Sequence, residues 1–130
     1  MSNSHFEKKV AVCIATYRRP EGLSRLLISL QNLEFKISAP PKWHVIIIDN
    51  DREGSARKVF EEMRPSFPVP IEYHIEQTKG IASARNAAVK HVQDFDFVAL
   101  VDDDEVAEPT WLDELLSVQS QYQANFVNAQ

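Results

Sequence analysis

Four acidic side chains in a row, at residues 102–105, form the sharpest chemical feature of the sequence. Neighbouring carboxylates repel one another unless a cation lies among them, and Mg²⁺ or Mn²⁺ takes carboxylate oxygens and bridges to substrate phosphates. Alternate residues of an extended segment share a direction, so Asp102 and Asp104 are expected to face a ligand together, with Asp103 turned away. The alternative is a solvated acidic turn before a helix. The position after the apolar segment 95–101 favours a ligand site.

A separate acid, Asp49, directly follows the apolar segment 43–48. A carboxylate at the end of a strand can accept hydrogen bonds from a nucleotide base or a ribose hydroxyl, as acids do in dinucleotide-binding folds. Asn50 and Asp51 follow it and are equally well explained as residues that shape a turn. We therefore interpret Asp49 as a nucleotide-binding residue and leave the other two open.

Cations that could meet a phosphate lie in two other segments. Lys79 and Arg85 lie on either side of the start of an expected helix, whose free backbone amides after Gly80 favour an anion. The alternative for Arg85 is a surface arginine paired with an acid. Arg18 and Arg19 follow the first apolar segment, and one of them is expected to face solvent. The histidines show no metal-ligand spacing and receive no role (His5, His44, His74 and His91).

Alternating apolar and helical patterns must position these residues. Continuous apolar or β-branched runs predict strands at residues 10–15, 43–48, 71–75 and 95–101, with a fifth beginning in 124–129. Helices are expected to begin at Pro20, at a cap on Ser55, at residue 81 and at Pro109. This alternation predicts an α/β fold, a Rossmann-like and mostly parallel sheet with flanking helices. In such a sheet the residues that follow each strand share one edge.

Composition narrows the class of protein. The 130 residues are 44% hydrophobic and 25% charged, which fits one globular domain. A net charge of -5 argues against a nucleic-acid binder. The lone cysteine, Cys13, lies in an apolar segment and is expected to be an inert core thiol, so we expect a reducing, cytoplasmic compartment. No apolar stretch approaches the ~20 residues that span a bilayer, although work at the inner face of the membrane stays open.

The segments that carry these residues resemble the family 2 glycosyltransferases, the large inverting group with the GT-A fold. The matching segments are VCIATYRRP at 12–20, IIIDN at 46–50, GIASARN at 80–86 and FVALVDDDE at 97–105. The last of them is similar to the DxD motif of the family. Four motifs in the right order cover nearly the whole chain. The Tyr-Arg-Arg-Pro and Asp-Asp-Asp-Glu variants are most similar to those of bacterial exopolysaccharide enzymes of the succinoglycan type.

The resemblance implies a role for each matched residue. Thr16 and Tyr17 would line the base pocket, and Asp104 would hold the Mn²⁺ or Mg²⁺ that bridges the diphosphate. The implied donor is a nucleotide-diphosphate sugar, with a UDP-sugar favoured. The acceptor would be a saccharide or a lipid-linked acceptor in cell-surface polysaccharide synthesis. The full implied nucleotide-binding set is Thr16, Tyr17, Arg19, Asp49, Lys79, Arg85, Asp102 and Asp103.

Members of this family are usually considerably longer, and their second half supplies the acceptor pocket and the catalytic base. No residue up to Gln130 matches that base, so no catalytic residue is assigned. We expect residues 1–130 to be a nucleotide-diphospho-sugar-binding domain, an N-terminal part of a longer glycosyltransferase that binds donor and metal without turnover. An unpaired sheet edge would also favour homo-oligomers.

Three other classes of protein share some of these features. A phosphorelay receiver domain carries acids after its first strand, where this chain has Thr16. Nucleotidyltransferases carry a glycine-rich basic loop there, whereas the first glycine after this strand is Gly22. A non-catalytic binding or interaction module that keeps an old enzyme fold stays open, because fold and site survive in such proteins.

Overall fold

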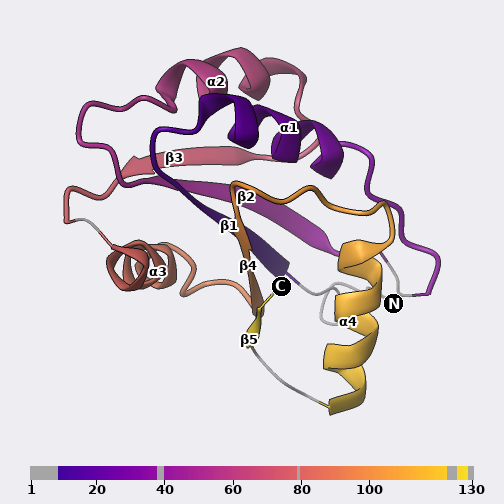
Figure 1. The fold of residues 1–130 in the computed structure, drawn as a ribbon. Helices are drawn as coiled ribbons and strands as arrows, with labels where there is room; N and C mark the ends of the chain where they lie inside the picture. The colour runs from indigo at the N-terminus through magenta and orange to yellow at the C-terminus, as the bar shows by residue number, and fades with distance from the viewer. Residues whose placement is uncertain (1–8, 38–39, 79, 123–125, 129–130) are drawn as a thin grey trace.

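A five-stranded parallel sheet forms the centre of the computed structural model, which describes residues 9–37, 40–78, 80–122 and 126–128 (Figure 1). The strand order is β3-β2-β1-β4-β5, and every neighbouring pair is parallel. The strands are Lys9–Thr16 (β1), Lys42–Asp49 (β2), Ile71–Ile75 (β3), Phe97–Asp102 (β4) and Phe126–Asn128 (β5). The predicted Rossmann-like sheet is confirmed, including a fifth strand within residues 124–129.

The helices of the described chain are Pro20–Leu30 (α1), Arg57–Met63 (α2), the short 3-10 helix Arg64–Ser66 (η2), Ile81–Lys90 (α3) and Trp111–Tyr122 (α4). Helix α1 begins at proline as predicted, because the fixed φ of proline suits a first helical turn. The predicted cap on Ser55 is wrong: Ala56 holds the N-cap position of α2, and its amide donates to Asp49 instead. Helix α4 begins at Trp111 and not at Pro109. Within the described residues, no helix has the length and apolarity needed to cross a membrane.

The core lies on both faces of the sheet. On one face, α1 contributes leucines at helical spacing and α4 adds Leu112 and Leu116. On the other face, Ala87 and Ala88 of α3 pack over β1 and β2. Figure 1 shows α1 and α2 side by side above the sheet and α3 on the opposite side. The four leucines of α1 are completely buried, namely Leu23, Leu26, Leu27 and Leu30.

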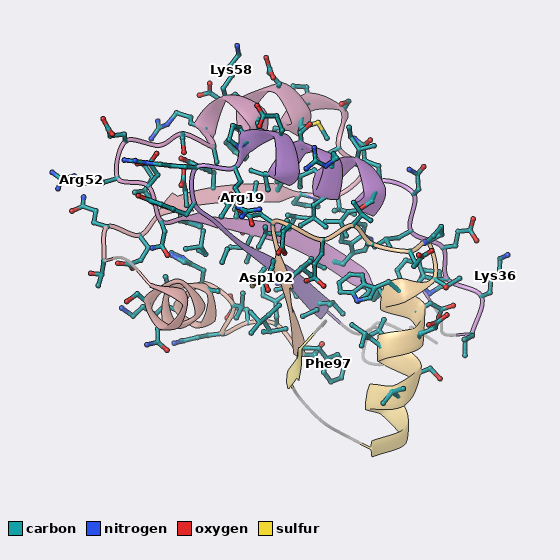
Figure 2. All side chains as sticks on the ribbon, in the orientation of Figure 1. Arg19, Lys36, Arg52, Lys58, Phe97 and Asp102 are labelled. Atoms are coloured by element: carbon teal, nitrogen blue, oxygen red, sulfur yellow. The ribbon has the colours of Figure 1, made fainter. Side chains whose placement is uncertain are left out.

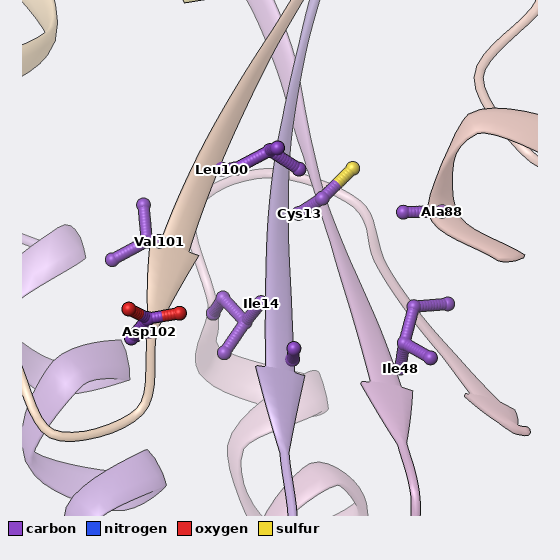
Figure 3. A pocket seen from close by; sticks show the side chains of 8 residues that line it. Cys13, Ile14, Ile48, Ala88, Leu100, Val101 and Asp102 are labelled. Atoms are coloured by element: carbon purple, nitrogen blue, oxygen red, sulfur yellow. The ribbon is translucent and has the colours of Figure 1, made fainter. Parts of the chain in front are cut away.

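Cys13 belongs to the face that α3 covers, and Figure 3 shows its sulfur directed toward Ala88. A cavity of about 10 Å³ lies here, between the sheet and α3, with Ile48 and Leu100 also in its lining. Such a space holds about one water molecule and no larger ligand. Burial raises the pKa of the Cys13 thiol to about 12. The prediction of an inert core thiol therefore has a physical basis, because the reactive thiolate is scarce at neutral pH.

Cys13 is expected to resist alkylation while the chain is folded. Iodoacetamide at pH 8 should leave the native protein unmodified, since the thiol is both buried and protonated. The same reagent in denaturing urea should add one label, which serves as the internal control. Mass spectrometry counts the labels, and rapid labelling of the native chain would contradict the expectation.

Candidate functional site

An open pocket of about 310 Å³ lies at the carboxyl ends of β1 and β4. The strand order reverses between these two strands, and open α/β sheets bind their ligands at such a switch point. Arg19 before α1 and Asp102 at the end of β4, both labelled in Figure 2, line the pocket from two sides. The full lining is Ala15, Thr16, Tyr17, Arg19, Asn50, Asp102, Asp103 and Asp104. The residues predicted from the first and fourth strand ends thus come together.

Three carboxylates gather at the edge of this pocket. One oxygen from each of Asp102, Asp104 and Glu105 lies within 4.8 Å of the others. The chain turns tightly here, because the amide of Glu105 donates to the carbonyl of Asp102 and the Asp102 amide donates to Glu105 Oε1 at 3.3 Å. Carboxylate oxygens are the ligands that Mg²⁺ and Mn²⁺ prefer, so the donor set fits the predicted metal. An extended run at 102–105 predicts only Asp102 and Asp104 on the ligand side, so the sequence pattern does not indicate Glu105.

Asp103 points away from its acidic neighbours and toward the end of β1. Its Oδ2 accepts hydrogen bonds from Thr16 Oγ1 at 2.8 Å and from the Tyr17 amide at 3.4 Å. The carboxylate therefore joins the loop after β4 to the loop after β1 and fixes the spacing between two walls of the pocket. Its own contact with a nucleotide stays a prediction.

Gly22 of α1 packs directly on this acidic loop. A Cβ atom at Gly22 would lie 2.6 Å from the carbonyl oxygen of Asp103, a contact that real side chains do not make. Gly22→Ala is therefore expected to lower the free energy of unfolding by about 1–3 kcal/mol, as overpacking does, although alanine is the better helix former. Urea unfolding measures this change. Ser24→Ala in the same helix is the control, and a Gly22→Ala protein as stable as wild type would contradict the packing argument.

Asp49 lies outside the lining of the pocket and has no exposed surface. Its two carboxylate oxygens accept hydrogen bonds from the amides of Asp51 and Ala56 and from the Tyr73 hydroxyl. Burial, together with the hydrogen bond that the Tyr73 hydroxyl donates to Asp49, raises the pKa of Tyr73 above its usual range. In the structure Asp49 thus organises the loop after β2, and its predicted contact with a base stays a prediction.

Asn50, which the sequence left open, is the residue of this loop that reaches the pocket. Its backbone N–H donates to the carbonyl of Thr16 at 2.9 Å, and its side-chain Nδ2 donates to the carbonyls of Glu76 and Thr78, each at 3.0 Å. These bonds connect the loops that follow β1, β2 and β3. The alternation of apolar strands and polar ends gave no signal that separates Asn50 from its neighbours.

The remaining predicted residues are placed less completely. Arg85 belongs to α3, but its side chain lies outside what the structure describes, as does the whole of Lys79. The ring of His74 stacks on that of His91, and the Nε2 atom of His74 lies 3.1 Å from Glu72 Oε1. The group of possible metal ligands found within the described residues contains no histidine.

The strand order, the switch point and the acids beside it define a Rossmann-like α/β protein. Comparison with known proteins gives the particular family. The chain belongs to glycosyl transferase family 2, whose sequence profile matches residues 11–130. It is 39% identical over 116 residues to the succinoglycan biosynthesis protein ExoM of Rhizobium meliloti (strain 1021), a match that covers 89% of this chain and 36% of that protein. The chain thus spans about a third of the length of this relative.

Solved structures of the GT-A type share the fold. S. aureus TarS 1-349 in complex with UDP matches with a TM-score of 0.71 and 21% identity, over 88% of this chain and 33% of that one. The mannosyltransferase PcManGT from Pyrobaculum calidifontis, in complex with GDP-Man and Mn²⁺, matches with a TM-score of 0.68 and 19% identity, over 88% and 33% of the two chains. The predicted family and fold are confirmed. The receiver and nucleotidyltransferase alternatives are wrong. A flavodoxin-like receiver would show the strand order 2-1-3-4-5, whereas this sheet has the order 3-2-1-4-5.

Proposed function

We propose that this chain is the donor-binding part of an inverting glycosyltransferase. It would bind a nucleotide-diphosphate sugar, with a UDP-sugar favoured, for transfer to a saccharide or lipid-linked acceptor in cell-surface polysaccharide synthesis. The observation that carries the proposal is the group of Asp102, Asp104 and Glu105 at the edge of the switch-point pocket. Support comes from TarS in complex with UDP-GlcNAc, from PcManGT with GDP-Man and Mn²⁺, and from a relative named for succinoglycan biosynthesis.

The pocket divides into two parts with different chemistry. The exposed ring of Tyr17 suits a base, whereas the Thr16 hydroxyl donates to Asp103 and shapes the wall beside it. The acids at residues 102–105 suit a divalent cation and would repel a bare diphosphate. Arg19, with Lys79 and Arg85, would supply further positive charge to the phosphates.

In this proposal Asp104, with Asp102 and Glu105, would hold Mn²⁺ or Mg²⁺. When bound, the metal would supply positive charge beside the departing nucleoside diphosphate. Inversion also requires a base that deprotonates the acceptor hydroxyl, and we assign no residue of this chain to that step. The purified chain is therefore expected to bind the donor without transferring its sugar.

Calorimetric titration of UDP into the protein, with and without Mn²⁺, tests the proposal. Binding that requires Mn²⁺ would support it, because the three acids need a cation before they tolerate a diphosphate. GDP and TDP titrated in parallel report the base preference. If UDP, GDP and TDP all fail to bind in the presence of Mn²⁺, the proposal is wrong for this chain.

A further inference from the structure

Arg18 has an unusual backbone conformation for its residue type. Its φ is 54°, the left-handed region, where no other described residue except glycine lies. An L side chain pays an energetic cost there, so the surrounding contacts must hold it in place. Arg18 immediately follows Tyr17, which lines the pocket, but Arg18 does not belong to the lining itself.

The guanidinium group of Arg18 connects two loops. Its Nε lies 3.5 Å from Asp51 Oδ2, and its Nη2 lies 3.5 Å from Glu53 Oε1. The side chain of Asp51 is only 4% exposed, whereas those of Arg18 and Glu53 are 55% and 78% exposed. The Asp51 carboxylate also accepts a hydrogen bond from the Glu53 amide at 3.1 Å, and hydrogen bonds lower its pKa more than the charge of Arg18 does. Arg18 is therefore one of several partners of Asp51, and its contribution is the link to the loop after β1.

The same guanidinium also lies against the ring of Tyr17. Its Cζ is 5.1 Å from the ring centroid, within the range of a cation–π contact. The Tyr17 amide is fixed separately by its hydrogen bond to Asp103 Oδ2 at 3.4 Å. The backbone of Tyr17 is thus held from the β4 side and its ring from the β2 side, by way of Arg18.

We propose that Arg18 is a positioning residue for the nucleotide: it joins the loop after β1 to the loop after β2 and so holds the Tyr17 ring as a wall of the pocket. This inference rests on the proposed function and adds a residue that would not touch the ligand. Arg18 belongs neither to the carboxylate group of Asp102, Asp104 and Glu105 nor to the lining of the pocket. Loss of Arg18 therefore weakens recognition of the nucleoside and leaves binding of the diphosphate part unchanged.

Arg18→Asn tests this role with little risk to the fold, because asparagine tolerates the left-handed backbone. Two ligands are titrated in the presence of Mn²⁺, namely UDP and inorganic pyrophosphate. We expect the affinity for UDP to fall about threefold to tenfold, in the range of a lost cation–π contact and ion pair, while the affinity for pyrophosphate stays within about twofold.

Arg18→Lys keeps the charge without the planar fork and is expected to recover part of the UDP affinity. Arg52→Asn, at an exposed arginine of the neighbouring loop labelled in Figure 2, is the matched control and should bind as wild type.

Two results would overturn the inference. One is an Arg18→Asn protein that binds UDP as wild type does, and the other is an equal loss of UDP and pyrophosphate, which would indicate a general charge or folding effect. Thermal unfolding of each variant checks the fold, and Arg18→Lys carries the same comparison if Arg18→Asn does not fold. Failure of the proposed function looks different, because the wild-type chain itself would then bind neither UDP nor any other nucleotide.

Discussion

Asp104→Ala is expected to remove Mn²⁺-dependent nucleotide binding from a chain that still folds. Asp104 is the exposed member of the three-carboxylate group, so the fold does not depend on its side chain. Its removal leaves two of the three carboxylates to hold a cation, and the diphosphate then meets the remaining acids with less compensating charge. Loss of residues that merely support a metal ligand costs about 10–100-fold, so loss of a ligand should cost at least about a hundredfold. Calorimetry with Mn²⁺ and UDP measures the change.

The control for Asp104→Ala is Glu108→Ala, which removes the same charge from an exposed residue of the same loop. It should bind Mn²⁺ and UDP as wild type does, since Glu108 does not belong to the carboxylate group. Thermal unfolding should give similar midpoints for both variants. An Asp104→Ala protein that retains wild-type binding would place the metal elsewhere and contradict the assignment.

Asp113→Ala is expected to cause the largest loss of stability among the substitutions considered. Asp113 lies in the first turn of α4, has no exposed surface, and accepts hydrogen bonds from the amides of Lys36 and Ile37 at 2.6 and 2.8 Å. Alanine would remove the charged acceptor of both bonds, and a hydrogen bond to a charged group contributes about 1.5–3 kcal/mol. Lys36 and Ile37 are exposed, so water can replace part of this loss. The free energy of unfolding should therefore fall by about 2–4 kcal/mol, as measured by urea unfolding followed by tryptophan fluorescence.

Glu114→Ala is the matched control for Asp113→Ala, because it removes an exposed acid from the next position of the same helix. Its expected effect is about 1 kcal/mol or less, because it loses only an exposed hydrogen bond from Thr110 Oγ1. Asp113→Asn should fall between the two, since its amide oxygen can still accept one of the bonds. A stability loss in Asp113→Ala no larger than in Glu114→Ala would show that the loop after α1 does not need this anchor.

The sequence predicted the layered fold well because the physical signal is local. Ile46, Ile47 and Ile48 form a continuous apolar run that suits a strand covered on both faces, and the structure buries all three. The predicted starts of α2 and α4 were wrong, and for α2 the reason is a contact that is not local. The amide of Ala56 is taken by Asp49, a partner seven residues away, and no local capping pattern indicates such a bond.

The candidate site was predictable only to the extent that the ends of parallel strands share an edge. That rule brought Thr16, Asp102 and Asp104 together, and the structure agrees. It could not show that Glu105 turns back toward Asp102. Asp113 gave no signal either, because its partners are 76 and 77 positions away in the sequence. Contacts of this kind depend on the finished fold and not on periodicity.

The hydrogen bonds of Asn50 have a consequence for engineering the chain. The side chain of Asn50 donates to the carbonyls of Glu76 and Thr78, and its backbone N–H donates to the carbonyl of Thr16. The three loops are therefore expected to behave as one exchangeable unit. Grafting a single loop from a relative would separate the donor from its acceptors. Chimeras that test the proposed nucleotide binding should therefore exchange all three loops at once, and recombination points are best placed within the strands.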